Sequence, residues 1–304
     1  MKKLIALFGA ALILFSFVSC GKEKYLLTFG EHIVTNGLYN YYKSVAYAEK
    51  SENADETARQ YCREYLAAIK LMEDEKITLG SEYKRLAAEN TENIWGIFSE
   101  YYSSIGVTKQ DITRMQTHES RKLQLLEHFY GSAGKDPVKE IDLKERFVDM
   151  YVGFKAIEGN LTRTNDKGET VPLTEKEIKE TEKLFASMAK QINEGTATID
   201  ELNIQYNDSL GIIVTSPLSV LLTKNKDPMY DDGFFADVSN INHGKAGVIK
   251  SGDSVYVIER QTIATDDEDA FMNYRTEILK DMRMEKIEKK LKNLIGKMNI
   301  TENF

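Results

Sequence analysis

A change of hydrophobic period at Tyr151 is the feature that most constrains how this chain can fold. From Val45 to Met150 the apolar residues recur every third and fourth position, which places them on one face of successive helices. From Tyr151 to Ile157 the pattern becomes that of a strand, and Gly159–Pro172 follows as a polar loop. The sequence therefore predicts a mostly helical α+β fold, in which a helical N-terminal domain precedes a smaller domain that contains a sheet.

Within the helical part, two patterns predict how single helices pack. Residues 81–104 form a helix whose expected inward stripe consists of Tyr83, Leu86, Ala87, Ile94, Ile97, Phe98 and Tyr101. The next helix is expected to begin after Thr108, whose hydroxyl can cap it. Asp111 lies three residues further on, where the helix dipole favours a negative charge.

The second half of the chain alternates short helices with strands. After an amphipathic helix that Gly195 closes and a short helix behind it, strands are expected at Leu210–Thr215 and Ala246–Ile249. Ser251–Ser254 is a tight-turn sequence between two apolar runs and predicts a hairpin. A long charged helix over Asp266–Lys297 then ends the chain, and it can return to pack on the first domain.

The N-terminus carries a targeting pattern. Lys2 and Lys3 precede an apolar run from Leu4 to Val18, which is shorter than the roughly 20 residues that a membrane-spanning helix needs and is typical of a signal peptide. The run ends in Ser19-Cys20-Gly21, which resembles the bacterial lipobox, whose Cys is lipidated after cleavage. We therefore expect a lipidated Cys20 that anchors the chain to a membrane of the cell envelope, outside the cytoplasm. The alternative is an ordinary cleaved signal peptide with a Cys placed there by chance.

Composition and motif spacing exclude several classes of function. The formal net charge of the chain is −8 and becomes more negative when the leader is removed, so nucleic acid is not an expected partner. Cys62 is then the only thiol left, and no intramolecular disulfide can form. No glycine-rich phosphate loop is present, and the histidines lack metal-binding spacing at His32, His118, His128 and His243. We therefore expect neither a metal nor a cofactor.

The order of these elements resembles the SurA and PrsA group of extracytoplasmic parvulin-type foldases. Phe29–Thr35 looks like the opening strand and turn of that group, and residues 183–202 are similar to its parvulin helix segment. Val248–Ile258 is similar to the terminal parvulin hairpin. The resemblance covers nearly the whole mature chain. It implies four parts: a lipoprotein signal peptide (1–19), a SurA-like helical chaperone domain (20–150), a parvulin-like domain (151–262) and a C-terminal helix that packs on the N-terminal domain (263–304).

The departures from the parvulin pattern bear directly on activity. The two active-site histidines of parvulin isomerases fall on Lys155 and Tyr256, and the family's glycine-rich loop is reduced to the stretch at Asp208. These three residues are the candidate catalytic positions, and the resemblance implies little or no prolyl isomerase activity. The alternative is an active isomerase in which apolar residues such as Met188 or Phe234 reshape the pocket.

Aromatic residues are dense in the helical domain and suggest a binding surface. Adjacent positions on a helix do not face each other, so one member of each pair in Tyr41-Tyr42 and Tyr101-Tyr102 is expected at the surface. These four tyrosines are the candidate residues for binding client polypeptides. The sequence thus indicates a membrane-anchored extracytoplasmic chaperone that binds unfolded exported polypeptides. A further alternative is an envelope scaffold or a solute-binding lipoprotein.

Overall fold

The computed structural model describes the chain apart from residues 1–24, 215, 224–228 and 264–267. The expected signal peptide (1–19) and Cys20 lie outside the described residues. Within the described part, none of the helices combines the length and the apolar character that crossing a membrane requires.

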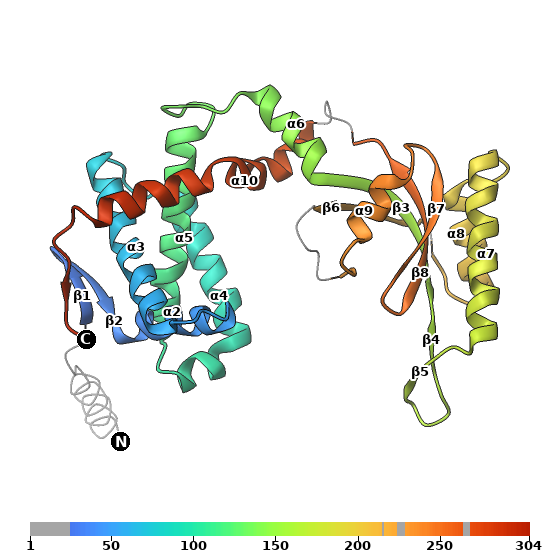
Figure 1. Ribbon diagram of the computed structural model, residues 1–304, viewed down its shortest axis with the longest axis horizontal. Helices are drawn as coiled ribbons and strands as arrows, with labels where there is room; N and C mark the ends of the chain where they lie inside the picture. Colours follow the sequence, from blue (N-terminus) through green and yellow to red (C-terminus); the bar gives the residue numbers. More distant parts are fainter. Residues whose placement is uncertain (1–24, 215, 224–228, 264–267) are drawn as a thin grey trace, which may run out of the picture. The chain divides into compact units, whose positions relative to one another are not determined.

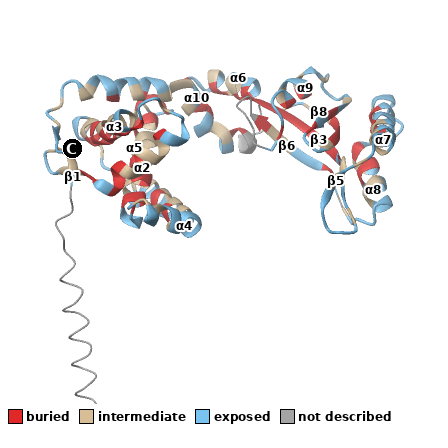
Figure 2. Cartoon of the chain, turned by 60° about the horizontal axis from the view of Figure 1, so that its bottom comes forward, coloured by how far each residue is buried: buried red, intermediate tan, exposed pale blue. Residues whose placement is uncertain are grey.

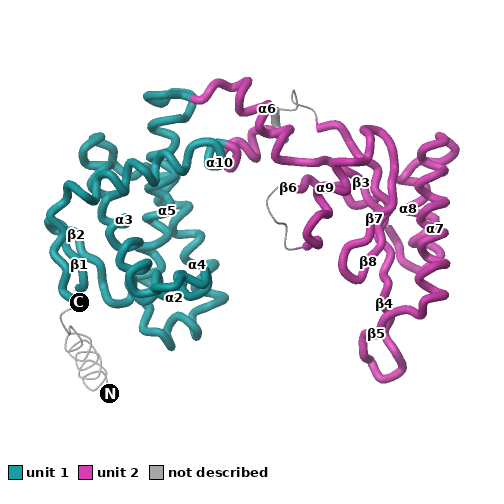
Figure 3. The backbone as a smooth tube through the Cα atoms, in the orientation of Figure 1, with its two compact units in different colours: residues 1–137, 279–304 teal, residues 138–278 magenta. Residues whose placement is uncertain are grey.

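The chain divides into two compact units (Figure 3). The first consists of residues 1–137 and 279–304, and the second of residues 138–278. The division falls ahead of Tyr151, where the sequence placed its domain boundary. The reason is that the helix before Tyr151 already packs with the second unit: its Phe147 contacts Tyr151 and Phe271, with ring centroids 5.3 and 6.0 Å away.

The first unit is built mainly of helices (Figure 1). Its elements are β1 (Tyr25–Phe29), β2 (His32–Thr35), α2 (Asn36–Ala48), α3 (Ala54–Asp74), α4 (Ser81–Ser104), α5 (Lys109–Tyr130), the C-terminal part of α10 (Glu268–Ile295) and β9 (Thr301–Glu302). Its core joins α2, α3 and α5, with Leu38, Leu66 and Ile112 fully buried. The inward faces of these helices are the buried stripes in Figure 2.

Local capping explains where the helices of the first unit begin. Thr35 caps α2, since its hydroxyl accepts a hydrogen bond of 3.1 Å from the N–H of Leu38. Thr108 and Asp111 form a reciprocal capping box at the start of α5, which confirms the cap that the sequence predicts. Asp111 also accepts from the Thr35 hydroxyl at 2.6 Å, so the caps of two helices are joined in one buried cluster.

The C-terminus completes the first unit. Lys290 of α10 lies 4.4 Å from the ring centroid of Phe129 on α5. After α10 the chain forms β9, which pairs antiparallel with β1, and Glu302 in β9 bonds Arg63 of α3 at 2.8 Å. The sequence predicts the helix but gives no sign of this last strand, which is only two residues long.

The second unit is a sheet covered by helices on both faces. Its elements are α6 (Glu140–Met150), β3 (Tyr151–Asn160), β4 (Thr162–Thr164), β5 (Thr170–Pro172), α7 (Glu175–Glu194), α8 (Ile199–Ser209), β6 (Leu218–Thr223), α9 (Phe234–Asn240), β7 (Ala246–Ser251), β8 (Ser254–Gln261) and the first part of α10. The main sheet is antiparallel and has the order β6-β3-β8-β7. Ser251 pairs with Ser254 across the tight turn, which confirms the predicted hairpin.

Two separate hydrophobic clusters lie on the two faces of this sheet. One joins the sheet to α9 through Phe234 and Val238, and the other joins it to α7 and α8 through Phe185 and Leu202. The strand expected at Leu210–Thr215 is wrong, because residues 211–214 form no strand and the next strand is β6. The chain turns at Gly211, whose φ of +73° favours glycine.

Candidate functional site

The three candidate catalytic residues do not form one site. Side chains alternate between the faces of a strand, and residues paired across an antiparallel ladder share a face. Lys155 on β3 pairs with Glu259, whereas Tyr256 on β8 pairs with Glu158. Lys155 therefore lies on the face covered by α7 and α8, and Tyr256 belongs to the cluster under α9. The interpretation of these two positions as one degenerate site is wrong.

On its own face, Lys155 has a structural partner. Its ammonium group bonds both carboxylate oxygens of Asp200 at 3.0 and 3.2 Å, and this contact joins β3 to the first turn of α8. Both side chains are partly exposed. The ion pair therefore joins an inner strand of the sheet to α8.

On the opposite face, Tyr256 is part of a packed aromatic cluster. Its hydroxyl donates to Glu158 at 3.0 Å, and its ring centroid lies 5.6 Å from that of Phe234 and 6.0 Å from that of Tyr230. Burial, followed by the bond to Glu158, raises the pKa of Tyr256 to about 12, so the phenol stays neutral at physiological pH. The ring of Tyr256 is thus packed within this aromatic cluster, while its partner Glu158 also lines a pocket of about 510 Å³ beside α8.

Met188 and Phe234, the apolar residues expected to reshape an active pocket, do not come together, and Asp208 belongs to neither of their clusters. Asp208 is exposed in the last turn of α8 and makes no side-chain hydrogen bond or ion pair within the described residues. Met188 and Phe234 belong to the two different clusters on opposite faces of the sheet, so they cannot shape one pocket. Sequence reasoning missed Glu158, the partner of Tyr256, although strand register would have placed the two together.

The four candidate tyrosines of the first unit separate into buried and exposed members. Tyr42 is 7% exposed and is part of the core, while Tyr41 is partly buried against that same core. The expectation that Tyr42 binds clients at the surface is therefore wrong. Tyr101 is 52% exposed, and its ring lies 5.4 Å from that of Tyr102, which in turn lies 5.8 Å from Tyr41.

The outward face of α4 carries an apolar patch, which we call the α4 patch and define as Ile97, Phe98 and Tyr101. Their exposed fractions are 73%, 49% and 52%. The sequence assigned all three to the inward stripe of this helix, which is wrong. Ile94 packs on the core, as the sequence predicts, and Trp95 and Tyr102, which were not in the predicted stripe, pack there too. The apolar residues of this helix surround it on more than one side, so hydrophobic spacing alone could not identify the buried face.

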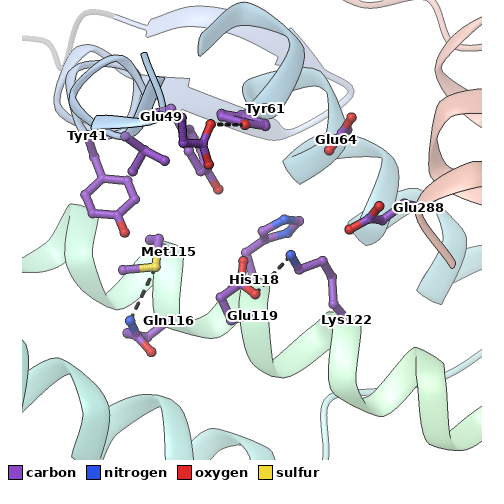
Figure 4. A pocket seen from close by; sticks show the side chains of 12 residues that line it. Tyr41, Glu49, Tyr61, Glu64, Met115, Gln116, His118, Glu119, Lys122 and Glu288 are labelled. Atoms are coloured by element: carbon purple, nitrogen blue, oxygen red, sulfur yellow. Dashed lines mark hydrogen bonds and ion pairs between the residues drawn. The ribbon is translucent and has the colours of Figure 1, made fainter. Parts of the chain in front are cut away.

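The first unit also contains a pocket of about 430 Å³ between α2, α3, α5 and α10 (Figure 4). It is lined by Tyr41, Tyr42, Val45, Glu49, Tyr61, Glu64, Met115, Gln116, His118, Glu119, Lys122 and Glu288. Sequence reasoning singled out two of these tyrosines but not the pocket, because its walls come from four helices far apart in the chain. We call it the acidic pocket after its four glutamates.

Burial controls the ionisation of the groups deepest in the acidic pocket. Burial first, then the charges of Lys122 and Arg121, hold the pKa of His118 well below its usual value, so its imidazole is neutral at pH 7. Burial likewise raises the pKa values of Tyr41 and Tyr42, which remain neutral phenols. In the described residues, no group of three or more His, Cys, Asp or Glu side chains is arranged to hold a metal ion.

No family model and no curated protein matches the chain, but several solved structures are similar to it. The foldase PrsA of Lactococcus lactis is 13% identical, covering 92% of this chain and 95% of that one, with a TM-score of 0.40. PrsA of Streptococcus pneumoniae is 14% identical, covering 90% of this chain and 92% of that one, with a TM-score of 0.40. A structure from work on the SurA-like chaperones PEB4 and Cj1289 of Campylobacter jejuni is 12% identical, covering 92% and 99%, with a TM-score of 0.32. Along nearly its whole length, the chain is thus similar to PrsA and SurA-like proteins.

Proposed function

We propose that this protein is a chaperone of the cell envelope that holds unfolded exported polypeptides outside the cytoplasm. The observation that carries the proposal is the α4 patch. Ile97 and Phe98 precede Tyr101 by four and three positions, so the three side chains are neighbours on one helical surface. A contiguous, solvent-exposed apolar patch of this kind marks an interaction site in soluble proteins.

The chemistry of the α4 patch suits an unfolded partner. Aromatic side chains bury a large area for few rotatable bonds, and a tyrosine adds a polar group that tolerates water nearby. Such a surface can accept many apolar segments without a fixed sequence. Tyr102 and Tyr41 continue the aromatic contacts from Tyr101 toward the core, which gives the exposed rings a firm support.

We further propose that the second unit catalyses little or no prolyl isomerisation. Isomerisation requires a pocket that can hold a twisted imide and lower part of a barrier of about 18–20 kcal/mol. Tyr230, Phe234 and Tyr256 pack against one another where one candidate position lies, and Lys155 lies on the other face. The second unit then serves as a structural or binding module.

The membrane tether is the third part of the proposal. It depends on the signal-like run and on Cys20, which precede the described residues. Mass spectrometry of the mature protein tests it directly. A lipidated N-terminal Cys is expected, and a Cys20→Ala form that stays in the membrane fraction would argue against the anchor.

The decisive experiment for the chaperone role measures aggregation of an unfolded protein in the presence of the chain. We expect the triple variant Ile97→Ser, Phe98→Ser, Tyr101→Ser to lose most of the protection that the wild-type chain provides. The matched control is Ile141→Ser, Val148→Ser, Leu184→Ser, which removes three similarly exposed apolar side chains from the second unit. Equal loss in both variants, or none in either, would refute the α4 patch as the client site.

The same preparations are assayed for exchange of a proline peptide between its isomers. We expect no turnover above the uncatalysed rate. Turnover that falls in a Tyr256→Ala variant would instead establish an active isomerase.

A further inference from the structure

The acidic pocket has an excess of negative charge. Among the described residues that line it, Glu49, Glu64, Glu119 and Glu288 stand against one cation, Lys122. Lys122 is already engaged, with its ammonium group 2.9 Å from the Glu119 carboxylate. Because His118 is neutral, it does not compensate for the remaining carboxylates. Clefts lined by one sign of charge concentrate the opposite charge, so this pocket attracts cations.

The four carboxylates differ in whether they already have hydrogen-bond or ion-pair partners. Glu49 accepts from the Tyr61 hydroxyl at 2.6 Å, and Glu64 accepts from Gln60 at 2.9 Å. Glu288, which is partly buried, has neither a hydrogen bond nor an ion pair with any residue that the structure describes. Figure 4 shows Glu64 and Glu288 on the same side of the pocket as Lys122. A second cation could therefore bind there without displacing Lys122 from Glu119.

Two deeply buried polar atoms of the pocket have no partner among the described residues. They are the hydroxyl oxygen of Tyr42 and Nδ1 of His118, in side chains that are 7% and 4% exposed. Most buried polar atoms in proteins are hydrogen-bonded, and leaving one unpaired is costly. Both atoms can accept a hydrogen bond, the imidazole in the tautomer that carries its proton on Nε2. They favour a ligand rich in donors.

The walls of the pocket add an aromatic component. The ring of Tyr42 lies 5.5 Å from that of Tyr41 and 5.8 Å from that of Tyr61. Aromatic faces attract cations, and a planar guanidinium also stacks on them. The pocket volume of about 430 Å³ falls within the range of sites for small groups.

From these observations we infer that the acidic pocket binds a guanidinium group, presented as an arginine side chain of the client polypeptide. A guanidinium offers five donors in one plane, enough for Tyr42, His118 and a carboxylate together. It is more weakly hydrated than an ammonium group, so it loses less on entering a partly buried site. The inference rests on the proposed chaperone role, since it names a second feature that the client presents beside the α4 patch.

The test is titration calorimetry on the full chain in detergent with two short blocked peptides. They differ only in one central residue, which is arginine in one and the uncharged isostere citrulline in the other. We expect the arginine peptide to bind at least about tenfold more tightly. Equal binding of the two peptides would overturn the inference. If a blocked single arginine bound as tightly as the peptide, the claim that the guanidinium is presented by a polypeptide would be refuted.

Variants locate the site. Glu64→Gln with Glu288→Gln is expected to weaken binding of the arginine peptide about tenfold, toward the level of the citrulline peptide. The matched control, Glu31→Gln with Glu82→Gln, removes the same charge from exposed positions of the same unit outside the pocket. Equal weakening in both variants would show a non-specific charge effect and overturn the site.

The two proposals fail separately. If the variant Ile97→Ser, Phe98→Ser, Tyr101→Ser keeps the arginine preference but the wild-type chain gives no protection against aggregation, the chaperone role is refuted and the site remains. If protection depends on the α4 patch but the citrulline peptide binds equally well, the chaperone role remains and the site is refuted.

Discussion

The two units use the same residue types in opposite ways. In the second unit, Phe154, Tyr230, Phe234 and Tyr256 pack together between the sheet and α9 and are almost wholly buried. In the first unit, Phe98 and Tyr101 remain about half exposed on α4. The difference depends on whether another element covers the aromatic side chains. A sheet face buries a row of aromatics when a helix covers it, whereas α4 packs mainly on α5 and leaves its outer side in solvent. Aromatic content therefore indicates a core in one unit and a binding surface in the other.

The largest effect is expected from truncating a buried ring. Phe154 is 1% exposed, and Phe154→Ala should lower the free energy of unfolding of the second unit by about 3–5 kcal/mol, since it leaves a cavity in the sheet cluster. Phe98→Ala should change the free energy of unfolding of the first unit by only about 0.5 kcal/mol. Urea unfolding measures both. Similar losses at the two positions would show that the α4 patch is part of the core.

A second prediction separates the units by their response to pH. The pKa of His118 is lowered in the folded state, so the unfolded state binds the proton more readily below its ordinary value of about 6.5. The contribution of His118 is therefore fully present above about pH 6.5. As the pH falls below that value, the free energy of unfolding of the first unit should drop by up to about 1.4 kcal/mol per pH unit.

The measurement is the slope of the free energy of unfolding against pH, compared between the wild type and His118→Gln. The comparison cancels the other groups near the ring, which include Arg121, Lys122 and Glu119. His243→Gln is the control, because that histidine is exposed in the second unit. If His118→Gln left the slope unchanged, the imidazole would not be buried in its neutral form.

The smallest effect is expected at Lys155. Its ion pair with Asp200 is partly exposed, and such pairs are worth about 0–1 kcal/mol. Lys155→Met should therefore cost the second unit less than about 1 kcal/mol and leave protection against aggregation unchanged. Thermal unfolding and the aggregation assay measure these two results. A large loss of protection against aggregation would show that Lys155 takes part in client binding. The client site would then not be confined to the first unit.

Local patterns predict well the elements whose cause is local. The capping box at Thr108, the tight turn at Ser251–Ser254 and the helical period before Tyr151 all depend on residues a few positions apart. The strand expected at Leu210–Thr215 was misplaced because its apolar run is short and follows a helix end, where a turn at Gly211 competes. Periodicity also failed on α4, where apolar residues lie on more than one side of the helix.

The site depended more on long-range contacts. The resemblance to parvulins placed Lys155 in the first strand and Tyr256 in the last strand of the domain, but the two side chains lie on opposite faces of the sheet. A shift of one residue along a strand moves a side chain to the other face, so short motifs without register could not decide between Lys155 and its neighbours. The acidic pocket gave no sequence signal, because Glu64, His118 and Glu288 come from three separate helices.

By itself, the sequence determined the helical first part, the change to strands at Tyr151, the final hairpin and the charged last helix, because hydrophobic period and turn chemistry act over short distances. Only the tertiary structure decided which face of α4 is exposed, that Tyr42 is buried, and that Lys155 and Tyr256 lie on opposite faces of the sheet. It also decided that the chain ends in β9 beside β1. These outcomes depend on which elements cover one another, and that is fixed by contacts between residues far apart in the sequence.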